Sequence, residues 1–147
     1  MVVEFETDQH LSIITLNRPE ARNAVNGDVA QGLEAALDRY EADPDLWAAI
    51  LTANGKAFCA GADLKEIAAG RAHLLTTAKG GFAGIVSRAR TKPLIAAIAG
   101  SALAGRPNVT CVVADALAPE PLRAALAPGG ADLIVLSALL EHLPDPG

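Results

Sequence analysis

The sequence predicts an α/β fold, with a β-sheet covered by helices. Short β-prone runs alternate with a run of helical periodicity, which is typical of layered α/β proteins. The chain of 147 residues is 51% hydrophobic, enough for the core of one ordinary domain. With only three Phe, one Trp and one Tyr, that core must be built from Ala, Val, Leu and Ile. These observations favour closely packed strands and helices.

The first elements are expected to be two strands and a helix. Residues 2–7 (VVEFET) and 11–16 (LSIITL) are short β-prone runs joined through Asp8 and Gln9, which predicts a hairpin. Residues 27–43 (GDVAQGLEAALDRYEAD) carry apolar side chains at helical spacing and end at an Asp-Pro pair. The periodic residues are Val29, Leu33, Leu37 and Tyr40.

The next elements continue the alternation. Residues 47–53 (WAAILTA) predict a buried strand ended by Asn-Gly. Residues 63–70 (DLKEIAAG) predict a helix with an Asp cap and a Gly stop. After a polar stretch over 71–81, a second helix is expected over 82–90 and a strand over 94–100 (LIAAIAG). The expected order is therefore β, β, α, β, α, α, β.

The composition changes after Gly105, where the chain becomes rich in Pro and Ala. Two further strand-like runs lie at 109–113 (VTCVV) and 132–137 (DLIVLS), and a short helix is expected between prolines at 118–130. We therefore divide the chain into residues 1–105 and a divergent α/β segment at 106–147.

Charge and composition exclude several functional classes. A net charge of −5 without a Lys/Arg cluster argues against a nucleic-acid partner. The N-terminus is acidic, and no apolar run reaches the length of a membrane span, so we expect a cytoplasmic protein without a membrane partner. Two cysteines and three scattered histidines give no metal-ligand spacing, so no metal is expected.

One stretch, residues 57–67 (AFCAGADLKEI), has small side chains where bulky ones are expected. Gly61 has no Cβ, and Ala60 and Ala62 have the smallest, so a ligand atom could approach the main chain here. The N–H groups at the start of the following helix would favour a polarised oxygen. Local sequence alone leaves a second interpretation open, in which the small residues serve only close packing.

Three segments in order resemble motifs of the crotonase, or enoyl-CoA hydratase/isomerase, superfamily. They are residues 16–25 (LNRPEARNAV), 56–67 (KAFCAGADLKEI) and 92–105 (KPLIAAIAGSALAG). The resemblance covers about the first 105 residues and implies a truncated crotonase-like layered fold. It favours the interpretation that a ligand binds at the small-residue turn over residues 59–63, hereafter the bare turn.

The resemblance implies an acyl-coenzyme A site with a backbone oxyanion hole. Such a hole needs two converging main-chain donors that stabilise negative charge on the thioester oxygen. By resemblance these donors are the N–H groups of Ala62 and Gly105. Coenzyme A arrives as part of the substrate, so no separate cofactor is implied. The implied substrate-binding residues are Ala21, Arg22, Ala60, Asp63, Leu64 and Lys65, with the two cations best placed for phosphates.

The sequence departs from the family after Gly105. Asn108 and Pro128 stand where hydratases of the family carry catalytic glutamates, and neither can move a proton. Acid–base catalysis typically contributes about 10²–10⁴-fold, so we expect little or no hydration of enoyl-CoA. Glu120 and Glu141 are the nearby carboxylates, interpreted as solvated. The alternative is a non-catalytic acyl-CoA-binding or interaction module. The family's C-terminal oligomerisation helices have no counterpart here, which leaves open whether the chain forms a homo-oligomer.

The C-terminal segment has a resemblance of its own. Residues 108–117 (NVTCVVADAL), followed by 131–146, are similar to the middle strands of class I S-adenosylmethionine-dependent methyltransferases. In that family the position of Asp115 lies near the cofactor adenine. The glycine-rich loop that should precede it is absent, so we expect no binding of this cofactor. A methyltransferase-like protein is thus the third and weakest alternative.

Overall fold

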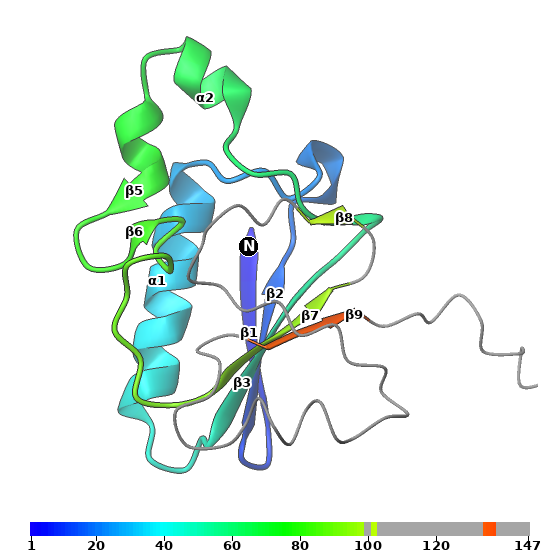
Figure 1. The fold of residues 1–147 in the computed structure, drawn as a ribbon, viewed down its shortest axis with the longest axis vertical. Coiled ribbons are helices and arrows are strands. Elements are labelled where there is room, and N and C mark those ends of the chain that lie inside the picture. Colours follow the sequence, from blue (N-terminus) through cyan, green and yellow to red (C-terminus); the bar gives the residue numbers. More distant parts are fainter. Residues whose placement is uncertain (99–100, 103–133, 138–147) are drawn as a thin grey trace, which may run out of the picture.

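A five-stranded sheet is the centre of the fold, and one long helix covers one of its faces (Figure 1). The computed structural model describes residues 1–98, 101–102 and 134–137. In the sheet, the strand order is β1-β2-β3-β7-β9. The bounds of these strands are β1 Val3–Asp8, β2 Leu11–Leu16, β3 Ala48–Ala53, β7 Leu94–Ile98 and β9 Ile134–Ser137. The α/β fold class is confirmed.

The first two strands form the expected antiparallel hairpin, with Val3 opposite Leu16 and Asp8 opposite Leu11. The turn residues are Gln9 and His10, one position later than predicted, and Gln9 takes a left-handed backbone with φ of 52°. From β2 onward the neighbouring strands pair in parallel. Parallel neighbours require crossover connections, and the helix α1 supplies the first of them.

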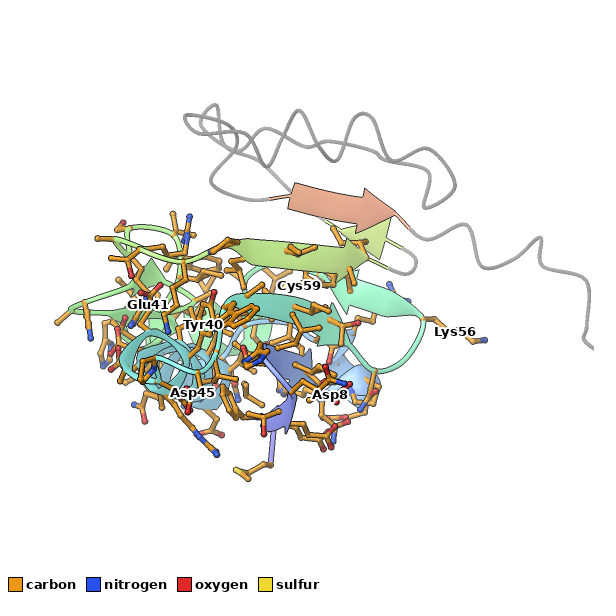
Figure 2. The ribbon with its side chains drawn as sticks, turned by 90° about the horizontal axis from the view of Figure 1, so that it is seen from below. Asp8, Tyr40, Glu41, Asp45, Lys56 and Cys59 are labelled. Atoms are coloured by element: carbon orange, nitrogen blue, oxygen red, sulfur yellow. The ribbon has the colours of Figure 1, made fainter. Side chains whose placement is uncertain are left out.

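Helix α1, Gly27–Ala42, confirms the helix expected from periodicity. The Asn26 side chain caps it by accepting from the N–H of Val29 at 3.0 Å. The four periodic apolar residues are buried against Ile14, Leu16, Leu51 and Leu94 of the sheet. The Tyr40 hydroxyl donates to the carbonyl of Pro93 at 2.7 Å, which fixes the end of α1 beside the start of β7 (Figure 2).

Short elements at one end of the sheet surround the bare turn. Strand β4, Ala57–Cys59, pairs in parallel with β8, Ser101–Ala102, and helix α2, Leu64–Ala68, follows the turn. Asp63 caps α2 as predicted, since its side chain accepts from the N–H of Lys65 at 2.9 Å. Gly70, the predicted stop, lies just after the helix with φ of +75°.

The second predicted helix, residues 82–90, is wrong. The polar stretch leads through the single-turn helix η2, Ala72–Leu75, into β5, Thr76–Thr77, and β6, Gly81–Phe82, which form a small hairpin. Turns follow, because Ala83 and Gly84 have φ of 57° and 71° and a right-handed helix cannot pass through them. Residues 76–92, hereafter the strap, run along α1 (Figure 1). Contacts with α1 decide the conformation of the strap in place of its local propensity.

The two strands expected near the C-terminus have different outcomes. The run at 132–137 is a strand over Ile134–Ser137, paired with β7. The expected strand at 109–113, the expected helix at 118–130 and the end of the strand at 99–100 lie outside the described residues. The division of the chain at residue 105 lies there too and remains a prediction.

Candidate functional site

Two connections that are distant in sequence meet at the bare turn. The segment between β2 and α1 carries Val25, which forms an isolated parallel bridge with Ala62. The Val25 N–H donates to the carbonyl of Gly61 at 2.8 Å, and the N–H of Asp63 donates to the carbonyl of Val25 at 2.9 Å. The first two motifs of the sequence are thus joined by main-chain hydrogen bonds.

This bridge determines where the Ala62 N–H points. In a parallel bridge, the two hydrogen bonds to Val25 use the groups before and after Ala62, so the N–H of Ala62 itself faces the other way. The neighbouring N–H groups are engaged, Ala60 with the carbonyl of Arg22 at 3.0 Å and Gly61 with Cys59 Sγ at 3.4 Å. No described residue accepts a hydrogen bond from the Ala62 N–H. Among the residues that the structure describes, the Ala62 N–H is therefore a donor of the turn that no acceptor engages.

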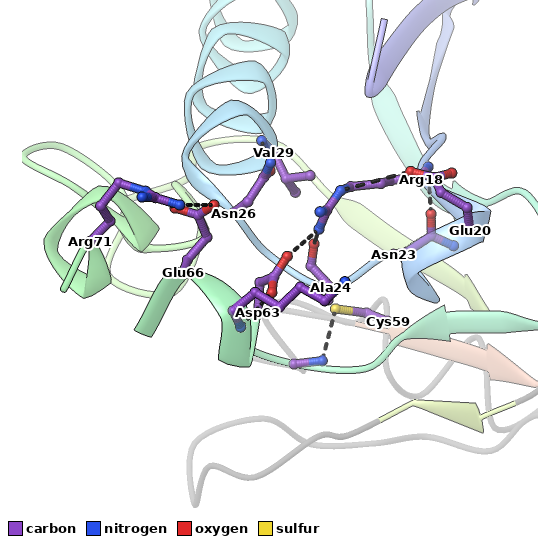
Figure 3. A network of polar contacts seen from close by, with 12 residues as sticks. Arg18, Glu20, Asn23, Ala24, Asn26, Val29, Cys59, Asp63, Glu66 and Arg71 are labelled. Atoms are coloured by element: carbon purple, nitrogen blue, oxygen red, sulfur yellow. Dashed lines mark hydrogen bonds and ion pairs between the residues drawn. The ribbon is translucent and has the colours of Figure 1, made fainter. Parts of the chain in front are cut away.

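An ion pair between Arg18 and Asp63 holds the two connections together (Figure 3). Arg18 Nη1 donates to Asp63 Oδ2 at 2.7 Å and to the carbonyl of Ala24 at 3.0 Å. The Asp63 side chain is only 8% exposed, so this pair is largely shielded from water. The Arg18 guanidinium holds the pKa of the Asp63 carboxyl below its ordinary value, and the carboxylate is ionised at neutral pH.

Asn23 fixes the other side of the site. It is 1% exposed and has a left-handed backbone with φ of 53°. Its side-chain oxygen accepts from the N–H of Arg18 at 2.8 Å, and its amide donates to the carbonyls of Asn54 and Ala57 at 2.9 and 2.8 Å. One buried amide thus joins the connection after β2 to the segment that leads into β4.

The structure brings most of the predicted substrate-binding residues close to the turn. Arg22 contacts it through the bond from Ala60, and its side chain is exposed beside the half-buried Ala21. Leu64, 76% exposed, and Lys65 lie in the first turn of α2. Asp63 lies in the turn itself, but its carboxylate is already bound by Arg18 and by the start of α2. Gly105, the second predicted donor, lies outside the described residues.

An apolar cavity of about 140 Å³ lies beside the turn, between the sheet, α1 and the strap. Cys59 and Gly61 contribute to its wall, and burial raises the pKa of the Cys59 thiol, which keeps this group neutral. The remaining lining residues are Leu16, Val25, Val29, Leu33, Leu51, Phe58, Phe82, Ala83, Ile85 and Val86. A cavity of this composition accepts an apolar group and offers it almost no hydrogen-bonding partner.

The sequence model of the enoyl-CoA hydratase/isomerase family matches residues 6–117, which includes all three motifs. The chain belongs to the enoyl-CoA hydratase/isomerase family. A probable enoyl-CoA hydratase of Mycobacterium tuberculosis is 48% identical over 68 residues, which are 46% of this chain and 27% of that protein. The mevalonyl-coenzyme A hydratase of Beauveria bassiana is 44% identical over 106 residues, covering 65% of this chain and 38% of that protein.

Solved structures of the enoyl-CoA hydratase/isomerase family share the fold. A probable enoyl-CoA hydratase/isomerase from Mycobacterium abscessus superposes with a TM-score of 0.62 at 43% identity, covering 67% of this chain and 38% of that one. An enoyl-CoA hydratase from Mycobacterium tuberculosis H37Rv gives 0.64 at 39% identity over 92% of this chain and 45% of that one. The chain therefore spans less than half the length of these relatives.

The comparisons confirm the crotonase resemblance and give the methyltransferase resemblance no support. The family match continues past Gly105 to residue 117, into the segment that we compared with methyltransferases. Asp115, the residue assigned to a cofactor adenine, lies within the match but outside the described residues. Short buried strands look alike in many parallel α/β proteins, so a likeness of this kind is not specific to one family.

Sequence reasoning missed Arg18, Asn23 and Val25, which position the turn without being predicted to touch a ligand. The available signal was their place within the first motif, where two polar residues and a valine follow a strand. Polar residues of these types are mostly exposed in proteins, whereas Asn23 is buried and Arg18 is partly buried. Their partners on the other connection, Asp63, Asn54 and Ala62, lie more than thirty residues away in sequence, and no local pattern identifies those.

Two further observations concern function classes. No helix in the described parts of the chain is long and apolar enough to cross a membrane. Within the same residues, no group of three or more His, Cys, Asp and Glu side chains could hold a metal ion.

Proposed function

We propose that this chain binds acyl-coenzyme A thioesters, with the Ala62 N–H as a donor to the thioester carbonyl. The observation that carries the proposal is this N–H, which no described residue engages and which the parallel bridge aims away from Val25 in a chain of the enoyl-CoA hydratase/isomerase family. A preorganised main-chain N–H stabilises a polarised oxygen without rearrangement, and removing one such donor typically costs about 2.7–4 kcal/mol in the transition state. We propose Gly105 as the second donor.

The remaining parts of the ligand have suitable surroundings near the turn. Arg22, whose carbonyl is bonded to the turn, and Lys65, in the first turn of α2, are exposed cations of the kind that binds phosphate oxygens. The apolar cavity beside Gly61 suits the acyl chain, since its walls are hydrocarbon and one neutral thiol. In this proposal Asp63 positions the turn and α2, because Arg18 and the N–H of Lys65 already engage its carboxylate and its N–H is bonded to Val25.

We further propose that hydration of enoyl-CoA is at or near background. Hydration requires one group to activate water for attack on the β-carbon and to return a proton to the α-carbon. Asn108 and Pro128 cannot do this. The two carboxylates closest in sequence to the turn are both engaged, Asp63 with Arg18 and Glu66 with Arg71 at 2.7 Å. Arg71 also lowers the pKa of Glu66, which makes it a poor base.

Binding is tested by calorimetric titration with acetyl-CoA and with S-ethyl-CoA, which lacks the thioester carbonyl. We expect acetyl-CoA to bind in the millimolar range or better, and S-ethyl-CoA to bind more weakly. In parallel, the amide resonance of Ala62 should shift downfield only with acetyl-CoA. Equal affinities and an unchanged Ala62 resonance would exclude the assigned donor, and no heat from either ligand would exclude the acyl-CoA site altogether.

The phosphate contacts and the missing activity need separate measurements. Arg22→Gln and Lys65→Gln should weaken binding, whereas Lys56→Gln, which removes an exposed lysine beside Gly55, should not.

Turnover is followed as loss of the conjugated thioester absorbance of crotonyl-CoA. A rate well above the uncatalysed one would contradict the proposal of a non-hydrating binder and point to another carboxylate as the base.

A further inference from the structure

The side of α1 that faces the strap carries three carboxylates, Glu34, Asp38 and Glu41. Their spacing of four and three residues puts them on one face of the helix. Glu34 Oε2 accepts from the hydroxyl of Thr77 at 2.5 Å and from the N–H of Gly80 at 2.8 Å. Glu41 accepts from the hydroxyl of Thr91 at 2.5 Å. Both ends of the strap are therefore bound to one helix face.

Asp38 binds the middle of the strap through two cations. Its Oδ1 accepts from Lys79 Nζ at 2.5 Å and from Arg88 Nη2. The Arg88 side chain is only 3% exposed, and its buried Nε and Nη1 atoms have no hydrogen-bond partner in the part of the chain that the structure describes. A buried guanidinium that has one carboxylate as its acceptor depends on that carboxylate strongly, because its charge is otherwise uncompensated.

The strap also forms part of the cavity wall. Phe82, Ala83, Ile85 and Val86 line the cavity on the side opposite the sheet residues. Gly84 lies against α1 so closely that a Cβ atom there would be 2.4 Å from the carbonyl oxygen of Ala30. The strap thus lies in close contact with α1 at Gly84 and also contributes to the wall of the cavity.

We propose that Arg88 and Asp38 are positioning residues that fix the distance between the strap and α1. By holding this wall of the cavity in place, they limit the size of the apolar group that the cavity admits. A cavity of about 140 Å³ accommodates a group about as large as benzene, as dry apolar cavities of similar volume do. Where the cavity takes the acyl chain, this inference rests on the proposed function, and it then predicts a preference for short acyl groups. The restriction itself concerns the cavity alone.

The test compares Asp38→Asn with Asp28→Asn, an exposed carboxylate in the first turn of the same helix. Two readouts are used on the whole chain. Hydrogen exchange measures opening of the strap, and NMR titration of the Val29, Leu33 and Val86 methyl groups measures binding of benzene and of naphthalene. For Asp38→Asn we expect strap amides to exchange at least about tenfold faster, while β2 and β3 amides are unchanged. Naphthalene affinity should rise at least about tenfold relative to benzene.

A purely structural role for Asp38 would lower stability without changing the ratio of the two affinities. An unchanged ratio in a folded Asp38→Asn protein, or an equal change in Asp28→Asn, would overturn the proposal. If Asp38→Asn does not fold, Glu34→Ala is the second variant, since it removes the acceptor of Thr77 and Gly80 and should change the ratio in the same direction. Neither probe contains coenzyme A, so failure of acyl-CoA binding would leave this result interpretable.

Discussion

The bare turn and the strap are both irregular segments next to one cavity, but they are held in place by different chemistry. The turn, residues 59–63, is bonded through the main chain to the segment around Val25. The strap, residues 76–92, is bonded through the side chains of Glu34, Asp38 and Glu41. Main-chain bonds survive most substitutions, whereas side-chain bonds depend on residue identity. The position of the turn is therefore less sensitive to residue identity, whereas the position of the strap depends on three carboxylate side chains.

The largest effect is expected where the turn does depend on side chains, at the Arg18–Asp63 pair. Asp63→Ala leaves the guanidinium of Arg18 partly buried without its carboxylate and removes the cap of α2. Breaking a buried pair typically costs about 3–5 kcal/mol, and we expect a loss of about 4 kcal/mol in the free energy of unfolding. Urea denaturation measures it.

The control for this variant is Glu20→Ala, which also removes a carboxylate near Arg18. Glu20 is 3.9 Å from Arg18 Nε and its side chain is 73% exposed, so its loss should change stability by less than about 0.5 kcal/mol. Comparable losses in the two variants would mean that Asp63 is no more than a surface partner of Arg18.

The next effect concerns the close approach of the strap to α1. Gly84→Ala places a Cβ against the Ala30 carbonyl at a position with φ of +71°, and we expect a loss of about 3 kcal/mol. Gly70→Ala, with φ of +75° and nothing within 4 Å of its Cβ, isolates the backbone cost and should lose about 1 kcal/mol. Thermal denaturation of both variants gives the difference, and equal losses would show that strap and helix separate easily.

The pH dependence of stability tests the Arg18–Asp63 ion pair of the turn. Since Arg18 lowers the pKa of Asp63 from its ordinary value of 3.8, the folded state binds this proton less readily than the unfolded state. The stabilisation is therefore fully present above pH 4 or so and is lost as the pH falls through the lowered pKa. The stability gap between the unmodified chain and Asp63→Asn should shrink over that range. A gap that stays constant down to pH 2.5 or so would contradict the ion pair.

The smallest effect is expected from salt. The Asp38 side chain is 44% exposed and that of Asp63 8%, so ions reach the strap contact more easily. Raising the salt concentration from about 0.1 to about 1 M shortens the screening length from about 10 to about 3 Å. The destabilisation by Asp38→Asn should fall by a few tenths of a kcal/mol, while that by Asp63→Asn stays constant. Equal salt sensitivity would mean that both pairs are solvated alike.

The comparison also explains what could be predicted from sequence. The hairpin, α1, β3, β7 and the cap of α2 follow from periodicity and from local signals such as Asp63 before a run of helix formers. The strap was wrongly expected to contain a helix because its composition from Phe82 to Arg90 favours one, whereas contacts with α1 determine the conformation. Those contacts join residues 41 to 50 positions apart, and no local pattern contains them.

The candidate site shows the same limit. The small residues around Gly61 indicated a backbone donor, and the structure leaves the Ala62 N–H without an acceptor among the described residues. The groups that aim it, Arg18, Asn23 and Val25, were not found, because their contacts with Asp63, Asn54 and Ala62 exist only after folding. Residue types can thus suggest a donor, while its direction is a property of the tertiary structure.

Because of the bridge between Val25 and Ala62, the amide proton of Ala62 can report whether a ligand is bound at the turn. The amides of Ala60 and Asp63 are bonded on either side, so they should exchange with solvent only when the turn opens. The amide of Ala62 should exchange quickly in the folded chain, and it should slow only when an oxygen from outside the chain takes the position in front of it. A bound molecule could then be detected by this single amide, before anything is known of its chemistry.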